Sequence, residues 1–440
     1  MKLKTFPGGV HPPDNKQYTS AVPIEEFPLP QKVVIPMSQH VGAPSVPLVK
    51  VGEEVKTGQK IAEANAYVSI PQHSSISGKV TKIDTFLNPI GAMSLAIEIT
   101  GDGSDSWIDL VDEPDFMNLP VEEMKNRIKE AGICGMGGAG FPTIVKLSPP
   151  EDKPIDTVIL NGVECEPYLT ADHRLMLEQA TGIINGLKII MKILNAQHGM
   201  IGIESNKPDA IALMNKLLAS EKNLSVVPLK LKYPQGAEKQ LIYAATKRIV
   251  PAGGLPLDVG IVVQNVGTAF AIYEAVRFKK PLVERIITVT GSVVNNPKNL
   301  KARIGTLFSD LVTYCGGTKS EIGKVISGGP MMGYALPSLD APMAKGTSGL
   351  ILFSEKEART IEERNCIHCA HCVDVCPMNL VPSLIAQGVK GGDLNLAVKA
   401  GLQDCIKCGS CAYVCPAHIR IVQWVDTGKL RYAEEQRQAK

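Results

Sequence analysis

The alternation of apolar and polar positions changes several times along the chain, and each change predicts a different module. From residue 31 to about residue 100, short apolar runs alternate with glycine turns, as in a small β domain. From Val121 to about Asn265, apolar stretches of strand length alternate with longer stretches of helical period. This second pattern predicts an α/β module.

The α/β pattern predicts an ordered series of elements. A helix is expected over residues 121–131, a strand over 155–160 and one long amphipathic helix over 174–194. The remaining strands are expected at 200–203, 226–231 and 259–263, with helices at 209–219 and 237–247.

Other modules are expected before and after the α/β module. Residues 1–30 are rich in proline and are expected to form an extended arm. The elements expected after the α/β module are a strand at 286–290, a short helix at 306–314, a charged helix at 355–364, two short helices at 382–388 and 393–401, and a charged tail at 426–440 that frays. The expected domains are therefore 1–111, 120–280, 281–350 and 355–425, followed by the tail 426–440.

Composition and charge argue against several classes of protein. The chain has 440 residues, is 44% hydrophobic and 20% charged, and carries a formal net charge of +2, which gives no support to nucleic-acid binding. The N-terminal residues lack the apolar core of a signal peptide. The longest apolar segment, 182–194, contains two lysines and is too short to cross a bilayer. Any membrane association is therefore expected to be indirect.

Eight of the 11 cysteines form two runs with the spacing Cys-x2-Cys-x2-Cys-x3-Cys-Pro. This is the spacing of bacterial ferredoxins with two [4Fe–4S] clusters, in which the fourth cysteine of each run ligates the other cluster. Structural zinc is the alternative, but runs of three cysteines followed by Cys-Pro fit zinc poorly. The expected ligands are Cys366, Cys369, Cys372 and Cys415 for the first cluster, and Cys405, Cys408, Cys411 and Cys376 for the second.

A glycine-rich loop, Gly135 to Thr143, lies shortly before Lys146. Successive small residues allow backbone N–H groups to approach a phosphate closely. The loop lacks the preceding strand of a dinucleotide-binding fingerprint, so taken alone it is also compatible with a plain turn.

The loop resembles the FMN-binding loop of the flavoprotein subunit of respiratory complex I, which reads GGAGFPT with a lysine three residues on. Gly137–Thr143 and Lys146 match that pattern. Two departures are Val163 and Ala237, which stand where the family has an aspartate and a glutamate. Three further family motifs follow in order: Asn161 with Glu164, Glu166 and Pro167; Tyr233 with Gly236 and Glu238; and Asn265 with Val266 and Thr268.

The resemblance implies a role for each matching residue. Non-covalent FMN would convert the two-electron hydride of NADH into the single electrons that clusters accept. Gly137, Gly138, Gly140 and Lys146 would hold the phosphate region of FMN, Asn161, Glu164, Asn265 and Thr268 would hold the flavin, and Phe141, Glu166 and Glu238 would lie on the NADH side.

Two other modules resemble known domains. Residues 31–100 resemble the biotinyl/lipoyl-type barrel-sandwich domain, although the hairpin at 64–67, Ala-Asn-Ala-Tyr, has no lysine to modify. Residues 281–350 resemble a β-grasp module of the SLBB type. The expected fold is thus multidomain α/β: an N-terminal barrel-sandwich β domain, a complex-I-like FMN/NADH α/β domain, a β-grasp module and a helical two-cluster ferredoxin domain.

The whole chain resembles the C subunit family of the Rnf complex, the ion-translocating ferredoxin:NAD oxidoreductase of bacterial membranes. Residues 6–13, 39–44 and 235–240 add to this resemblance. It implies a peripheral subunit at the cytoplasmic face of the inner (plasma) membrane, with NAD(H) as substrate. The implied partners are integral membrane subunits and the ferredoxin-like B subunit.

Two alternative families share parts of this pattern. One is the cobalamin reductase of bacterial microcompartments, whose members start close to the flavin loop, so the N-terminal β domain argues against it. The other is the cluster-free scaffold subunit of the sodium-pumping quinone reductase. The eight spaced cysteines argue against that second alternative.

Overall fold

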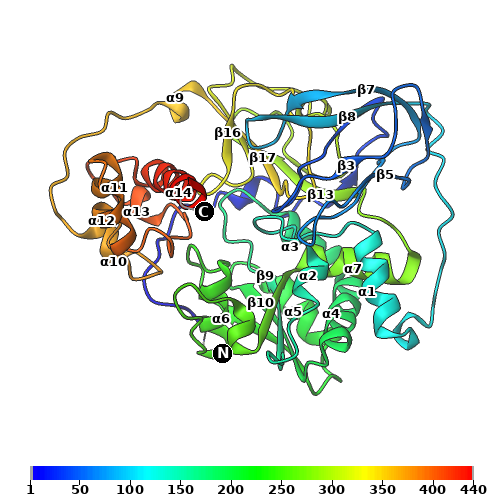
Figure 1. The fold of residues 1–440 in the computed structure, drawn as a ribbon, viewed down its shortest axis with the longest axis horizontal. Coiled ribbons are helices and arrows are strands. Elements are labelled where there is room, and N and C mark those ends of the chain that lie inside the picture. The colour runs from blue at the N-terminus through cyan, green and yellow to red at the C-terminus, as the bar shows by residue number, and fades with distance from the viewer. Residues whose placement is uncertain (1–2, 439–440) are drawn as a thin grey trace.

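The structure is a computed structural model that describes residues 3–438. In the view of Figure 1, the N-terminal β module and a six-stranded sheet lie above the α/β module, and the helical C-terminal module lies at the left. The N-terminal arm connects three of these modules.

The N-terminal β module contains two antiparallel sheets, as the glycine-punctuated apolar runs predicted. Their inward faces carry buried aliphatic residues such as Val33, Ile35, Ile61, Ile97 and Ile99. One sheet has the order β2 (Lys32–Pro36), β8 (Met93–Gly101), β7 (Gly78–Leu87) and β4 (Glu54–Val55), and the other has β3 (Val46–Pro47), β5 (Lys60–Glu63) and β6 (Gln72–His73).

The turn between β5 and β6 is the position at which a swinging-arm domain would carry its modified lysine. It holds Ala64, Asn65, Ala66 and Tyr67, and Tyr67 is 74% exposed. Because none of these side chains has an amine to acylate, we expect the intact mass after cofactor removal to equal that of the bare chain. An added mass equal to a lipoyl or biotinyl group would contradict this expectation.

The α/β module is built on a parallel sheet with helices on both faces. Within β9, Val158 and Leu160 enter one core and Ile159 enters the core on the opposite face. The strand order is β11 (Leu224–Leu229), β10 (His198–Glu204), β9 (Thr157–Gly162) and β12 (Ile261–Asn265). The helices are α1 (Val121–Glu130), α2 (Thr143–Lys146), α3 (Ala171–Glu178), α4 (Ala180–Leu194), α5 (Pro208–Leu217), α6 (Glu238–Thr246) and α7 (Val266–Phe278).

The prediction of one helix over residues 174–194 is wrong. The first helix, α3, ends at Glu178, and the helix is interrupted at Gln179, whose φ and ψ are −130° and 28°, before α4 begins at Ala180. Tertiary partners explain the break. The carboxylate of Glu164 caps the start of α3, whereas α4 packs against α7 so closely that a Cβ on Gly186 would lie 1.9 Å from the Ala269 oxygen.

The third module is the six-stranded sheet. Its strands, in spatial order, are β1 (Ile24–Glu26), β14 (Lys298–Arg303), β13 (Glu284–Thr290), β17 (Gly349–Phe353), β15 (Lys324–Ser327) and β16 (Tyr334–Leu336), and it carries helix α8 (Phe308–Tyr314). Strand β1 comes from the arm and pairs in parallel with β14. The sequence predicted an extended arm but not this pairing.

The arm also pairs with the α/β module, through bridges between Lys4 and Leu229 and between Val10 and Tyr233. The described part of the arm, residues 3–30, therefore holds modules together instead of hanging free.

The C-terminal module is helical, as predicted, but two of its details differ. The helix expected over 355–364 is limited to α9 (Glu355–Ala358), because the residues that follow are exposed and have no core to pack on. The tail expected to fray is part of α14 (Ile421–Gln438), whose Ile421 and Val425 enter the module's core; residues 439–440 lie outside the described part. The other helices are α10 (His371–Asp374), α11 (Pro382–Lys390), α12 (Leu394–Lys399) and α13 (Ser410–Tyr413).

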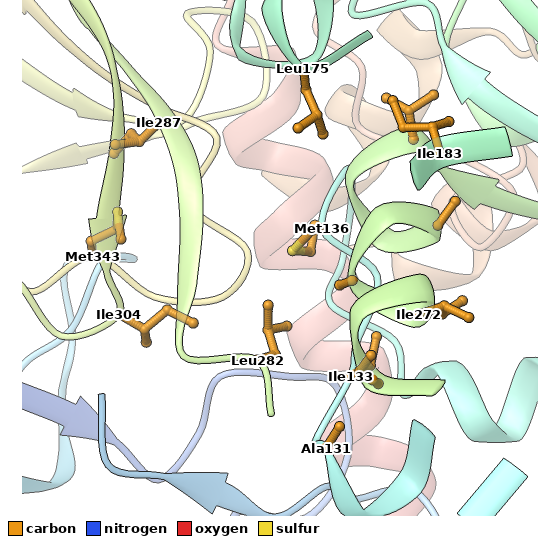
Figure 2. Packing of buried hydrophobic residues seen from close by; sticks show 14 of the residues in the cluster. Ala131, Ile133, Met136, Leu175, Ile183, Ile272, Leu282, Ile287, Ile304 and Met343 are labelled. Atoms are coloured by element: carbon orange, nitrogen blue, oxygen red, sulfur yellow. The ribbon is translucent and has the colours of Figure 1, made fainter. Parts of the chain in front are cut away.

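Figure 2 shows where the α/β module meets the six-stranded sheet. Met136, from the glycine-rich loop, lies between Ile287 of β13 on one side and Ile272 of α7 on the other. Ile133 is buried just before it and is 1% exposed. Fully burying a side chain of this size contributes about 1.5–3 kcal/mol. The start of the loop is therefore fixed in the core, while residues 137–139 are exposed to solvent.

Candidate functional site

The strand order of the parallel sheet reverses between β9 and β12: β10 and β11 lie on one side of β9, and β12 lies on the other. Ligands of open α/β sheets bind outside the carboxyl ends of the strands at such a point. Asn161 is the last residue but one of β9, Asn265 is the last residue of β12, and the two are register partners. The sequence-predicted flavin residues Asn161 and Asn265 therefore sit side by side at the expected crevice.

The two asparagines organise the loops around this crevice. Asn265 caps α7, because its Oδ1 accepts a hydrogen bond of 2.8 Å from the Gly267 N–H, and its Nδ2 donates to Asp172 at 2.6 Å. The Nδ2 of Asn161 donates to the carbonyl of Gly236 at 2.8 Å. Three separate segments are thus held at the carboxyl edge of the sheet.

The glycine-rich loop lies directly over Asn265. A Cβ on Gly137 would lie 2.6 Å from the Asn265 Nδ2, so only glycine allows this approach. On Gly138 a Cβ would meet nothing within 4 Å, and residues 137–139 are exposed. The Met136 N–H donates to the Thr268 hydroxyl at 3.0 Å. One side of the loop is thus held by Asn265 and Thr268, while the other side is open to solvent, which fits a phosphate-bearing cofactor such as FMN.

The N-terminal β module supports the far end of this loop. Gly140 has a φ of +70°, which favours glycine, and its carbonyl accepts a hydrogen bond from the Val41 N–H at 3.2 Å. Phe141 is half-buried next to it, and its carbonyl accepts from the Gly135 N–H at 2.9 Å. The conformation of the loop therefore depends on two modules.

Lys146 and Glu238 form an ion pair at the same site. Lys146 Nζ lies 2.7 Å from a Glu238 oxygen and donates to the Val263 carbonyl at 3.2 Å. Their side chains are 30% and 38% exposed. Ion pairs this exposed contribute at most about 1 kcal/mol, so either partner can exchange the other for a ligand at little cost.

Glu164 and Glu166 point in different directions. The Glu164 carboxylate accepts from the N–H groups of Asp172 at 2.7 Å and His173 at 3.2 Å. Glu166 is half-buried against the six-stranded sheet module, where it accepts from the Met331 N–H at 3.0 Å. Glu238, which the resemblance assigned to the NADH side together with Glu166, contacts Lys146 instead of Met331.

Three charged groups near these loops have shifted pKa values. Burial raises the pKa of Glu166 to about 7. Burial, with a smaller effect from the charge of Glu164, raises the pKa of Asp172 to about 7. Burial lowers the pKa of Arg285, which donates to the carbonyls of Lys345 at 2.6 Å and Met136 at 3.3 Å. Strongly shifted carboxyl groups in a cleft are a common feature of functional sites.

Two further residues of the site, Lys16 and Arg285, belong to no motif of the sequence. The ammonium of Lys16, which is 5% exposed, donates to the backbone carbonyls of Glu164 and Glu166, both at 2.9 Å, and to that of Leu169. A single lysine in a proline-rich arm has no pattern that could have identified it. Arg285 lies in an ordinary strand pattern and would also have been found only from the structure.

Each set of four cysteines expected from the spacing lines one hollow of the C-terminal module. Apolar residues also line both hollows, as the buried edge of a cluster requires. Within residues 3–438, no three His, Cys, Asp or Glu side chains converge as they would on a single metal ion. One hollow is lined by Cys376, Cys405, Cys408 and Cys411, and the other by Cys366, Cys369, Cys372 and Cys415.

Four protein-family models match successive parts of the chain. They are the RnfC barrel sandwich hybrid domain over residues 4–104, the Nuo51 FMN-binding domain over 128–274, the SLBB domain over 286–335 and the 4Fe-4S dicluster domain over 359–416. These matches confirm the expected multidomain α/β architecture. They also support FMN and two [4Fe–4S] clusters as the cofactors.

Curated relatives match most of the chain. The C subunit of the proton-translocating ferredoxin:NAD(+) oxidoreductase complex of Clostridium ljungdahlii is 51% identical, over 87% of this chain and 84% of the relative. The C subunit of the Na(+)-translocating complex of Acetobacterium woodii is 47% identical, over 88% of each. The C subunit of the ion-translocating oxidoreductase complex of Pseudomonas aeruginosa is 41% identical, over 98% of this chain and 56% of that relative.

Solved structures of an NAD+-reducing [NiFe]-hydrogenase share the fold. The H2-reduced form has a TM-score of 0.50 and the air-oxidized form 0.51, both at 19% identity over 72% of this chain and 64% of the hydrogenase chain. Among the helices of residues 3–438, none combines the length and the apolar character that crossing a membrane requires.

Proposed function

Because this chain belongs to the C subunit family of the ion-translocating ferredoxin:NAD(+) oxidoreductase complexes, we propose that its crevice between β9 and β12 is where electrons enter or leave as NAD(H). The chain is an oxidoreductase subunit whose FMN and two [4Fe–4S] clusters connect NAD(H) with the rest of a multi-subunit complex. The family relation favours this function over a cobalamin reductase or a cluster-free scaffold.

One observation carries the proposal: the glycine-rich loop, Asn161 and Asn265 converge at the switch point of a sheet whose chain also holds two hollows of four cysteines. When bound, FMN would supply the conversion between hydride transfer and single-electron transfer. The task of the protein is to hold the cofactor, orient the nucleotide and exclude competing reactions.

The proposed roles follow from the surroundings of each residue. The backbone of Gly137, Gly138 and Gly140, with Lys146, holds the phosphate region. Asn161, Asn265 and Thr268 hold the flavin, and Glu164 acts through the loop that it shapes. Phe141 and Glu238 lie on the NADH side. Glu166 belongs to the wall that faces the C-terminal module.

We further propose the place of the chain in its complex. It lies at the cytoplasmic face of the inner membrane as a peripheral subunit and contacts integral membrane subunits and a ferredoxin-like B subunit. Its partners provide the membrane attachment. The names of the relatives, which describe subunits of translocating complexes, support this placement.

A spectrum of the anaerobically reconstituted protein, recorded before and after NADH addition, tests the function. We expect flavin absorbance, the broad absorbance of clusters, and about eight irons per chain. Both absorbances should bleach when NADH is added. A protein that carries clusters but neither retains FMN nor responds to NADH would overturn the proposal.

Glu238→Gln tests the side on which NADH binds. The substitution removes the partner of Lys146 but leaves the loop contacts of Asn161, Asn265 and Thr268 in place. We expect FMN to stay near stoichiometric and the NADH dissociation constant to rise about tenfold, the effect of losing one hydrogen bond to a charged group. The measurement is the NADH titration of flavin bleaching.

The control for this variant is Glu221→Gln, which breaks the surface ion pair with Lys188 at 2.6 Å. It should change neither FMN content nor NADH titration. If Glu238→Gln loses FMN while the remaining holoprotein binds NADH as tightly as the wild type, Glu238 acts on the phosphate side of FMN and not on the NADH side.

A further inference from the structure

The loop between β11 and α6 carries Tyr233 into the C-terminal module. The Tyr233 ring is 2% exposed, and its hydroxyl donates a hydrogen bond of 2.8 Å to the backbone carbonyl of Cys408. The same hydroxyl lies 3.4 Å from an oxygen of Glu166. Val10, Tyr233 and Cys408 form a small buried cluster of their own. A residue of the α/β module thus fixes the backbone beside the middle thiol of the second cluster.

Gln240 makes a second contact of this kind. It lies in the first turn of α6, is 5% exposed, and its Nε2 donates to the carbonyl of Pro377 at 3.0 Å. Pro377 directly follows Cys376, the cysteine that crosses from the first run to the second hollow. From the arm, the Gly9 N–H donates to the Val375 carbonyl at 2.8 Å. The crossing cysteine is therefore held from the α/β side.

The first cluster's cysteines have different surroundings. Cys369 is exposed, and Ile367, which follows Cys366, is 67% exposed. In the part of the chain that the structure describes, no hydrogen bond joins residues 366–372 to the α/β module. The α/β module thus contacts the loops around the second hollow, and among the described residues none of its hydrogen bonds reaches residues 366–372 of the first.

Residues 233–240 connect the two sites over a short stretch of chain. Tyr233 and Gln240 contact the second cluster's loops, while the carbonyl of Gly236 accepts from Asn161 and Glu238 pairs with Lys146. Rates of electron transfer fall steeply with the distance between cofactors, so the position of these loops decides which cluster exchanges electrons with the flavin.

We infer that Tyr233 and Gln240 are positioning residues that hold the second cluster against the flavin crevice, which makes it the entry cluster and leaves the first cluster as the exit. The inference rests on the proposed function, because it supposes FMN at the switch point. It assigns no chemical step to either side chain.

Tyr233→Phe tests the positioning role, because it removes only the hydroxyl. We expect amide hydrogen exchange in residues 405–411 of the holoprotein to become about tenfold faster, as for the loss of one buried hydrogen bond. Exchange in residues 366–372 should not change. Gln240→Leu should have the same effect on residues 376–379. Unchanged exchange at both places, or an equal rise in residues 366–372, would overturn the inference.

Tyr243→Phe is the matched control. Tyr243 lies in the same helix α6, and among the described residues its hydroxyl makes no hydrogen bond to other protein groups, so its removal should leave exchange in residues 405–411 unchanged. Exchange needs no NADH, and its outcome is therefore independent of the proposed function. A wild-type protein whose FMN is not reduced by NADH would refute the proposed function instead.

The order of the clusters is tested by removing one at a time. In Cys369→Ser, the remaining second cluster should be reduced by NADH at the wild-type rate. In Cys408→Ser, the remaining first cluster should be reducible by dithionite, but at least about tenfold more slowly by NADH, because its entry point is lost. Rapid reduction of the first cluster by NADH in Cys408→Ser would overturn the order.

Discussion

Cys376→Ser is expected to damage the second cluster, although Cys376 belongs to the first cysteine run. The reason is its position: the side chain lines the same hollow as Cys405, Cys408 and Cys411. A [4Fe–4S] cluster needs four thiolates, so Cys376→Ser and Cys405→Ser should remove or degrade the same cluster. We expect about four of about eight irons to be lost in each variant, with the same signal missing from the EPR spectrum of the reduced protein.

Cys366→Ser is the control for the crossing. Its side chain lines the other hollow, with Cys369, Cys372 and Cys415, so it should remove the other EPR signal. If Cys376→Ser and Cys366→Ser remove the same signal, the ligands are not crossed and each run holds its own cluster.

The same variants test whether the modules are independent. The C-terminal module has its own core, which includes Ile385, Val389, Leu402 and Val425, and the helix α6 side of the α/β module has another. Cys405→Ser should therefore retain FMN and still reduce ferricyanide with NADH, because that acceptor can take electrons from a flavin. Electron transfer to the other subunits should be lost. Loss of ferricyanide reduction with FMN still bound would contradict this independence.

Local patterns predicted the parts of the fold that local forces determine. Cysteine spacing divided the eight cysteines into the two sets that line the two hollows, since a short loop that surrounds a cluster fixes the distances between its thiols. Apolar periodicity identified the four strands of the parallel sheet, because each buries apolar residues on both faces.

Features that depend on distant partners were missed. The break at Gln179 arises because α3 and α4 pack on different neighbours. Strand β1 has only three residues, too few for an alternating pattern, and forms because β14 offers a free edge. The buried side of α14 is defined by α11 and Leu402. None of these partners is visible from the local sequence.

In the candidate site, too, local motifs were predicted and contacts between distant residues were missed. The motifs located Gly137, Asn161 and Asn265, which the fold brings to one crevice. They could not show that Glu166 turns toward Met331, because that contact joins residues 165 positions apart. Nor could they reveal Lys16, whose three acceptors lie about 150 residues away in the chain: the separations are 148, 150 and 153.

Lys16→Met is expected to loosen the loop that carries Glu164 and Glu166 and to lower the FMN content. Methionine fills a similar volume but leaves three buried carbonyls, those of Glu164, Glu166 and Leu169, without their shared donor. Burial lowers the pKa of Lys16, so removing the charge also relieves part of a desolvation cost. After that relief we expect a net local cost of about 3 kcal/mol, equal to about a hundredfold faster exchange of the loop amides.

The matched control is Lys4→Met, in the same arm. Lys4 donates to one carbonyl, that of Ala245, at 2.8 Å and is less buried. Its loss should cost about 1 kcal/mol and should affect exchange near residue 245, with FMN retained. Hydrogen exchange of residues 164–172 and the flavin-to-protein ratio are measured for both variants. If Lys16→Met leaves that segment as protected as Lys4→Met does, the arm does not position the flavin loop, and the three hydrogen bonds contribute nothing to the site.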